Sequence, residues 1–185
     1  MFCLAKHPEK QEKLRNELLK IMPEKDSPLT VENMKNLPYL RAVIKENLRL
    51  FPPSLGNMRR TAENLVIHGY QVPKGVDIFL GLLHTCKDPT NFGRPDEFIP
   101  ERWLRHQEVE ACPRSLKQSH PFSYLPFGFG PRFCVGKRIA EMELEVFLSR
   151  VIRNYKIEWH HPDLKINATL VNAPDGDLKF KMIKI

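Results

Sequence analysis

The feature that most constrains the fold of this chain is a short segment rich in glycine and phenylalanine, FGFGPRFCVG at residues 127–136. It runs directly into residues 136–155, where apolar side chains cover most of a helical circumference, and this pattern predicts a deeply buried helix. Glycine allows close approaches that other residues do not, so the segment can lie against a flat ligand. The sequence therefore predicts a ligand-holding loop that presents Cys134 at the start of a buried helix.

The residue types around Cys134 suit an anionic sulfur ligand. A thiolate at a helix N-terminus is stabilised by the helix dipole and by free backbone N–H groups, without a base beside it. Glycines on both sides let N–H groups approach the sulfur, while Phe127 and Phe133 can shield it from water. Arg132 adds a permanent cation that suits a carboxylate or a phosphate.

Three other interpretations of this segment have less support. A lone cysteine is most often a small buried hydrophobe. A phosphate-binding loop would need the spacing GxGxxG or GxxxxGK[ST], and neither is present. A zinc site formed by Cys112, His120 and Cys134 would match no common zinc spacing. The four cysteines lie far apart without a CxxC pair, which favours a reducing compartment over a disulfide framework.

Composition and charge narrow the class of protein. Hydrophobic residues make up 42% and charged residues 28% of the 185 residues, which is the balance of a globular domain with a packed core. No apolar run reaches the roughly 18 residues of a membrane-spanning helix. The net charge of +7 is compatible with nucleic acid, an anionic membrane surface or an acidic protein as partner. Because basic and acidic residues are interleaved, we expect no nucleic-acid binding.

Helical periodicity is strongest in four places. Apolar spacing and the positions of prolines predict helices at residues 8–22 and 39–51, a short helical turn at 31–36, and the long helix at 136–155. In the helix at 39–51, the apolar residues fall in one arc and the charged residues in the other, so one face is expected to be buried.

Short β patterns occupy the remaining regular parts of the chain. Alternating apolar residues predict strands within 65–83, with a turn at His68 and Gly69, and again at 156–159 and 178–185. Residues 87–126 are rich in proline and lack periodicity, which is typical of a long irregular stretch wrapped on a larger body. The expected fold class is mainly α with small β-sheets.

Three motifs, in this order along the chain, resemble the cytochrome P450 family. Glu46 and Arg49 form an ExxR motif, PERW at residues 100–103 is similar to the family's PERF or PERW segment, and the loop fits FxxGxRxCxG. The resemblance runs from about His7 to the C-terminus and matches the C-terminal part of the family's much longer domain. We therefore expect residues 1–185 to be a single partial domain without the N-terminal part and the oxygen-activating helix. Such a chain should fold poorly or expose apolar surface, because its most deeply buried helix, at 136–155, would pack against segments that this sequence does not contain.

The resemblance implies haem b (iron protoporphyrin IX) as the cofactor, with the Cys134 thiolate as the iron ligand. Arg132 and Arg59 are expected to contact the haem propionates, and Arg60 is the alternative to Arg59. The residues implied to hold the cofactor are Phe127, Gly130, Arg132, Cys134, Gly136 and Arg59.

Glu46, Arg49 and Arg102 are implied to form a buried ion triad. Residues three apart on a helix share a face, so Glu46 can hold Arg49 beside it whatever the family. The alternative for such a pair is a solvated surface contact.

The resemblance also implies a substrate pocket, lined in this chain by Pro53, Ser54, Leu55 and Gly56 and by the segment around 168–169.

The implied reaction is insertion of one oxygen atom from O₂ into a small, lipophilic organic substrate, with electrons delivered one at a time by a redox partner. The whole protein is thus expected to be a haem-thiolate monooxygenase, and this fragment alone is expected to be inactive. The alternative is a truncated, non-catalytic haem-binding or interaction fragment.

Arg41 and Lys45 lie one helical turn apart, and like charges stacked in this way oppose a helix unless something anionic meets them. A solvated basic face is the ordinary interpretation of such a pair. The mitochondrial branch of the family carries a basic pair here for a ferredoxin-type donor, and CVGKRIAE at residues 134–141 is similar to that branch. The expected location is the matrix side of the mitochondrial inner membrane, with membrane association through parts outside this chain. The alternative is an endoplasmic reticulum enzyme that is served by a flavin reductase.

Overall fold

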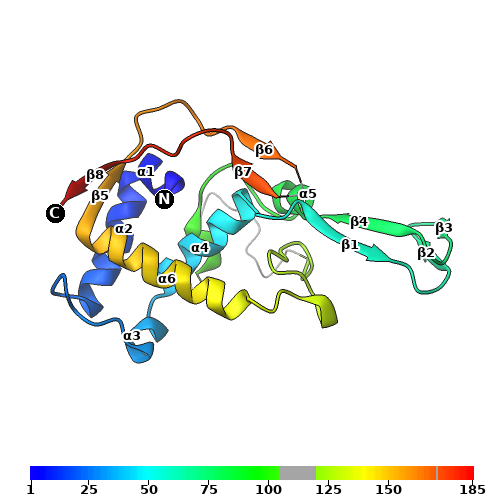
Figure 1. Cartoon of the computed structure of the whole chain (residues 1–185), viewed down its shortest axis with the longest axis horizontal. Helices are drawn as coiled ribbons and strands as arrows, with labels where there is room; N and C mark the ends of the chain where they lie inside the picture. Colours follow the sequence, from blue (N-terminus) through cyan, green and yellow to red (C-terminus); the bar gives the residue numbers. More distant parts are fainter. Residues whose placement is uncertain (105–119, 170) are drawn as a thin grey trace.

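The computed structural model describes residues 1–104, 120–169 and 171–185. Figure 1 shows a helical body from which a narrow β arm projects, and both termini lie in the helical body. No helix among these residues is long and apolar enough to cross a membrane.

The helices occupy the regions that apolar periodicity predicts. They are α1 (Phe2–Lys6), α2 (Pro8–Ile21), α3 (Val31–Lys35), α4 (Pro38–Leu50), α5 (Leu82–Lys87) and α6 (Lys137–Asn154), with 3-10 turns η1 (Pro100–Trp103) and η2 (Gly130–Arg132). Proline opens α2 and α4, where its fixed φ suits the first turn and its missing N–H costs nothing. The predicted helices at 8–22, 31–36, 39–51 and 136–155 are therefore confirmed to within one or two residues.

The strands form four separate two-stranded antiparallel sheets. They are β1 (Gly56–Arg60) with β4 (Asp77–Gly81), β2 (Leu65–Ile67) with β3 (Tyr70–Val72), β5 (Tyr155–Glu158) with β8 (Lys181–Lys184), and β6 (Ile166–Ala168) with β7 (Asn172–Pro174). The turn between β2 and β3 has positive φ at His68 (49°) and Gly69 (85°). This confirms the predicted turn, because a tight hairpin of this kind needs left-handed backbone at both central positions.

Three parts of the β structure differ from the sequence prediction. The strand expected to continue to residue 83 ends at Gly81, and the chain turns there into α5. Strand β1 was not predicted, because its sequence, GNMRR, has no apolar alternation and is extended only through pairing with β4. The hairpin of β6 and β7 was likewise not predicted within the C-terminal segment.

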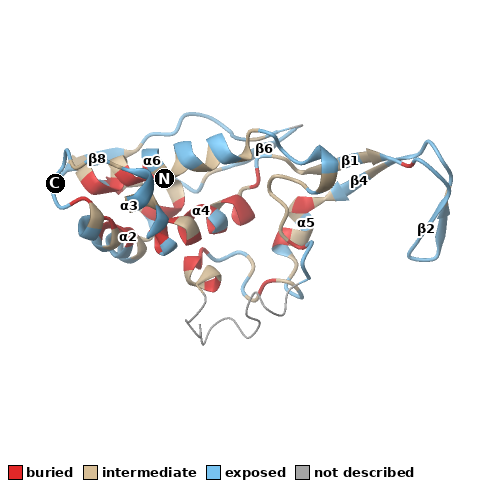
Figure 2. Ribbon diagram, turned by 90° about the horizontal axis from the view of Figure 1, so that it is seen from below, coloured by how far each residue is buried: buried red, intermediate tan, exposed pale blue. Residues whose placement is uncertain are grey.

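The core lies where α2, α4 and α6 pack against one another. Figure 2 shows that the buried residues are concentrated in these helices, while the hairpin of β2 and β3 is exposed. Leu14, Leu18, Leu40 and Ile152 are completely buried. Each such side chain contributes about 1.5–3 kcal/mol to folding.

Helix α6 is buried on one side only, which corrects the prediction of deep burial around its circumference. Leu148 and Ile152 face the core, but an apolar stripe on the other side is 37–60% exposed and consists of Ile139, Met142, Val146 and Phe147. The physical reason is that α2 and α4 cover a single face of the helix. The expectation that this chain exposes apolar surface along its most apolar helix is met.

Candidate cofactor site

The loop before α6 holds Cys134 in a defined backbone conformation. Gly128 and Gly130 have φ of 76° and 74°, values that side-chain-bearing residues rarely adopt. The backbone N–H of Cys134 donates to the carbonyl oxygen of Phe127 at 2.8 Å, and the N–H of Phe133 donates to that of Gly130 at 3.0 Å. Gly136 is the N-cap of α6, so the thiol lies two residues before the cap. The loop thus fixes the sulfur close to the helix N-terminus.

Cys134 is exposed, and so are the apolar residues near it in the sequence. Phe129, Phe133 and Val135 are each more than half exposed, whereas Phe127 is half-buried against α4. The prediction that Phe133 shields the sulfur inside the protein is therefore not met in this chain. A thiol within an exposed apolar surface is suited to a flat, apolar ligand that covers the surface and excludes water from the sulfur.

The other described cysteines are poor candidates for a thiolate ligand. Cys3 and Cys86 are buried, and burial raises the pKa of each thiol to about 11. Cys112 lies outside the described residues, so the alternative zinc site is not placed. No group of three potential metal-ligating side chains occurs within the described ranges. Among the cysteines with described structure, Cys134 alone offers its sulfur to a ligand.

Arg59 and Arg60 differ sharply in their surroundings. Arg60 forms a two-pronged ion pair with Asp77, at 2.9 and 2.7 Å, and this pair lowers the pKa of the Asp77 carboxyl. Arg59 is half-buried and donates to the carbonyl of Met58 at 2.8 Å. No carboxylate in the part of the chain that the structure describes pairs with Arg59. Of the two arginines, Arg59 has the guanidinium that remains available to an anionic ligand.

A cavity of about 580 Å³ lies between Arg59 and the loop at residues 127–136, which we call the cysteine loop. Arg59 and Phe79 line it from the β1–β4 ribbon, and Phe129 lines it from the loop. Phe122 packs edge-to-face on Phe129 with ring centroids 4.9 Å apart, which fixes the loop side of the cavity. Arg132 is exposed at the end of η2 and does not line this cavity.

Glu46 lies at the centre of a buried ion network. Its carboxylate accepts five hydrogen bonds of 2.8–3.0 Å, from Arg49 Nε and Nη2, Arg102 Nε, the Ile99 backbone N–H and the Trp103 indole. The side chains of Glu46 and Arg49 are fully buried, and that of Arg102 is 2% exposed. The structure therefore brings the three predicted triad residues together and excludes the solvated surface pair.

Backbone carbonyls accept further hydrogen bonds from the two arginines. Arg49 donates to the carbonyls of Cys86, Pro95 and Glu97, and Arg102 donates to that of Gly93. One carboxylate and two guanidinium groups leave a net charge of +1, which these carbonyl dipoles stabilise. The network thereby fixes α4, η1 and the irregular segment between α5 and η1 to one another.

The sequence analysis did not identify Trp103 as a member of this network. Its indole N–H donates to Glu46 Oε2 at 2.8 Å, and its ring lies 4.6 Å from the ring of Tyr124. The available signal was its position directly after Arg102 in the PERW motif. Nothing in the sequence indicates that the indole would point toward a carboxylate 57 positions away.

The segment predicted to line the substrate pocket, residues 53–56, is held in place by the hairpin of β6 and β7. The carbonyl of Pro53 accepts a 2.8 Å hydrogen bond from the backbone N–H of Asn172, and Ser54 pairs with Val171 in an isolated bridge. A Cβ at Gly56 would lie 2.2 Å from the carbonyl oxygen of Leu80, so β1 can approach β4 only with glycine there. Val171 and Asn172 thus lie beside Ser54 and Pro53.

Arg41 and Lys45 do not form a pair of free cations. Arg41 Nε binds Glu145 Oε1 at 2.9 Å, and its Nη atoms donate to the carbonyls of Met34 and Lys35. Lys45 is exposed, with its ammonium 5.8 Å from the centroid of the Trp103 ring. Arg41 thus joins α3 and α6 to α4, and of the two cations it is Lys45 that has no carboxylate partner among the described residues.

Comparison with known proteins gives consistent matches. A family described as Cytochrome P450 matches residues 1–180. The chain is 48% identical over 190 residues to cytochrome P450 CYP12A2 of Musca domestica, covering all of this chain and 35% of that protein. It is 52% identical over 186 residues to "Probable cytochrome P450 12d1 proximal, mitochondrial" of Drosophila melanogaster, with the same coverage.

A solved structure gives the same match in three dimensions. The chain superposes on the structure titled "Retinoic acid bound cyanobacterial CYP120A1" with a TM-score of 0.88 and 30% identity, covering all of this chain and 41% of that one. The chain therefore spans about a third of the length of the curated relatives that it matches.

Proposed function

Because the chain belongs to the cytochrome P450 family, we propose that it forms the haem-binding part of a haem-thiolate monooxygenase, with Cys134 as the iron ligand. The observation that carries this proposal is the exposed Cys134 thiol, held before α6 by a 2.8 Å backbone hydrogen bond to Phe127. The other two described cysteines are buried and protonated at neutral pH, so they do not compete for the iron.

The residues around Cys134, together with Arg59 and Arg132, fit haem b in shape and in charge. The exposed apolar side chains around Cys134 offer a surface for a macrocycle, and the glycines let the backbone pass close to it. Arg59, which lacks a carboxylate partner among the described residues, is suited to one propionate. Arg132 is exposed at the end of η2 and is proposed to bind the second.

Haem, when bound, supplies the chemistry that inserts one oxygen atom from O₂ into a small lipophilic substrate. The chain's own contribution is to hold the sulfur of Cys134 and to stabilise its negative charge through the adjoining N-terminus of α6. Phe129, Phe133 and Val135 exclude water from the sulfur once a ligand covers them. The segment Pro53, Ser54, Leu55 and Gly56 is proposed to line the substrate side.

The electron donor is proposed to be a ferredoxin-type protein, and the location the matrix side of the mitochondrial inner membrane. Support comes from the relatives, several of which carry the word mitochondrial in their names. The exposed ammonium of Lys45 provides a positive charge for an acidic donor, while Arg41 is neutralised by Glu145. The competing proposal is a flavin reductase on the endoplasmic reticulum.

The test compares two cysteine variants in a protein of full family length that carries this chain. Cys134→Ala should abolish the thiolate-type absorption spectrum of the ferrous carbon monoxide complex, because the proposed ligand is removed. Cys86→Ala removes one buried thiol and should leave the spectrum intact. An unchanged spectrum for Cys134→Ala would refute the assignment of the ligand.

A further inference from the structure

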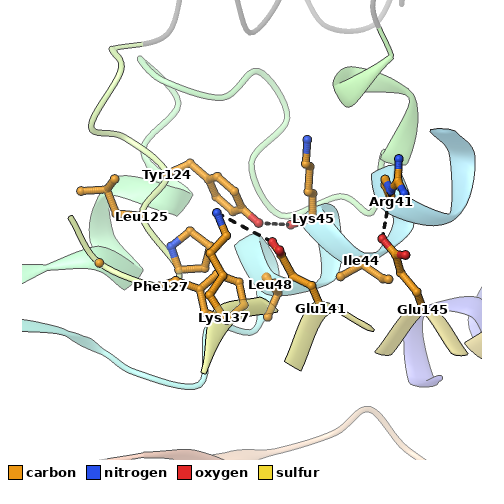
Figure 3. A pocket seen from close by; sticks show the side chains of 12 residues that line it. Arg41, Ile44, Lys45, Leu48, Tyr124, Leu125, Phe127, Lys137, Glu141 and Glu145 are labelled. Atoms are coloured by element: carbon orange, nitrogen blue, oxygen red, sulfur yellow. Dashed lines mark hydrogen bonds and ion pairs between the residues drawn. The ribbon is translucent and has the colours of Figure 1, made fainter. Parts of the chain in front are cut away.

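A second pocket lies between α4 and α6, on the side of the cysteine loop that faces α4. Its volume is about 300 Å³, and residues 124–128 of the loop close one end of it (Figure 3). Ile44 and Leu48 from α4, with Pro126 and Phe127 from the loop, give it apolar walls. A concave apolar site of this size suits a compact organic molecule.

Charged side chains of α4 and α6 surround these walls. Arg41 and Glu145 neutralise each other across the two helices at 2.9 Å. Lys137 and Glu141 are 3.9 Å apart, a long separation for an exposed ion pair, and the Lys137 ammonium lies 5.8 Å from the centroid of the Phe127 ring. Lys45 has no carboxylate partner among the residues that the structure describes. Three cations and two carboxylates leave this pocket with a net charge of +1.

We propose that this pocket binds a small organic monocarboxylate. The apolar body of the ligand would lie against Leu48 and Phe127, and its carboxylate would replace the long contact between Lys137 and Glu141 as the partner of the lysine. A monoanion matches the uncompensated positive charge, whereas a cation would be repelled by it. A neutral molecule of the same shape would gain the apolar contacts but not the ion pair.

This site is separate from the proposed cofactor site and does not depend on it. The thiol of Cys134 is exposed and does not line the pocket, and Arg59 lines a different cavity. The two sites adjoin at residues 125–128: Leu125 lines both cavities, and Phe127 lines this pocket while its carbonyl oxygen accepts the Cys134 N–H. The binding test can therefore fail or succeed whatever the haem experiment gives.

The experiment is a calorimetric titration of the full chain with 4-phenylbutyrate and, separately, with 4-phenylbutanol, which has the same apolar body without the charge. We expect one saturable site that binds the acid more tightly than the alcohol. Lys137→Gln should weaken the affinity for the acid about threefold, and Glu141→Gln should strengthen it about threefold, since an exposed ion pair has an effect of this order. Neither variant should change the affinity for the alcohol.

Two further variants distinguish this pocket from the other exposed apolar surfaces. Leu48→Phe adds volume at the wall and should abolish the saturable site, while circular dichroism verifies that the variant remains folded. Lys35→Gln removes an exposed lysine outside the pocket and should leave the affinity for the acid unchanged. Equal affinities for acid and alcohol, no saturable binding, or an acid affinity that is the same in Lys137→Gln and Glu141→Gln would overturn the proposal.

Discussion

Glu46 and Arg49 lie one turn apart in α4 and form a two-pronged ion pair, with Oε2 to Nε at 3.0 Å and Oε1 to Nη2 at 2.9 Å, in full burial. The same spacing occurs at the surface of α3, where Glu32 and Lys35 are 2.8 Å apart and largely exposed. An exposed pair contributes about 0–1 kcal/mol to the free energy of unfolding. Removing one partner from a buried carboxylate of this kind lowers the free energy of unfolding by about 3–5 kcal/mol.

Glu46→Ala should lower the free energy of unfolding by about 3–5 kcal/mol, because two guanidinium groups would remain buried without their carboxylate. Denaturant titration of the variant and of the parent protein measures this difference. Glu32→Ala is the matched control, since it breaks an exposed pair of the same spacing and should cost less than about 1 kcal/mol. Similar losses for the two variants would show that burial does not strengthen the pair at Glu46.

Trp103→Phe should lower the stability by about 1.5–3 kcal/mol, the usual contribution of a hydrogen bond to a charged group. The substitution keeps an aromatic ring against Tyr124 but removes the indole N–H that Glu46 Oε2 accepts at 2.8 Å. Trp159→Phe is the control, because its indole donates to the carbonyl of Pro162 in an exposed position. If both substitutions have equal effects on the unfolding midpoint, the bond to Glu46 is not a stabilising element.

Charge reversal at Lys45 and at Arg41 should have different effects. Lys45→Glu should slow association with an acidic donor, and the effect should shrink as salt is added. Arg41→Glu should instead lower the stability, because it places a second carboxylate beside Glu145 and loses the bonds to the carbonyls of Met34 and Lys35. Stopped-flow association rates and denaturant unfolding measure the two effects. Loss of stability in Lys45→Glu, or equal loss of association in both, would contradict this division of roles.

The sequence could predict the helices that form the core but not the environment of the polar residues on them. Helical periodicity placed α2, α4 and α6 correctly, because the apolar stripe of each helix is a local pattern. On a helical wheel, Glu46 and Arg49 fall among the polar residues of α4, and their burial depends on η1, which is more than 50 positions away. The resemblance to a family supplied that partner, whereas periodicity could not.

The sequence analysis did not predict β1 or α5, and the physical cause is the same for both. Strand β1 has no apolar alternation and is extended only because it pairs with β4. Helix α5 follows β4 without a turn residue between them, and β4 ends at Gly81, where its pairing with β1 ends. The prediction for α6 was wrong for a different reason. Its apolar residues were read as buried, although only one face of the helix meets a partner within the described residues.

The ion cluster around Glu158 should make the stability of the β5–β8 pair depend on pH. Hydrogen bonds from Lys156 and His160 lower the pKa of the Glu158 carboxyl from its ordinary value of 4.5 to about 2. A carboxyl with a lowered pKa in the folded state stabilises it above pH 4.5, and this contribution disappears as the pH falls toward 2. Glu158→Gln should therefore be less stable than the parent at pH 6 and equal to it near pH 2 in thermal unfolding. A stability difference that does not change between these pH values would exclude Glu158 as its source.

The apolar stripe on α6 should make the isolated chain associate with itself. Ile139 and Phe147 are 60% and 53% exposed on the same side of the helix, and apolar surface of this kind is covered by association when no other partner is available. Ile139→Glu combined with Phe147→Glu should shift the chain toward the monomer in sedimentation velocity, with little loss of stability, because exposed positions tolerate substitution. Leu148→Ala, one residue further along and buried, should instead cost about 2–5 kcal/mol and should not restore the monomer. If the double variant associates as strongly as the parent, another surface, such as the phenylalanines beside Cys134, must mediate the contact.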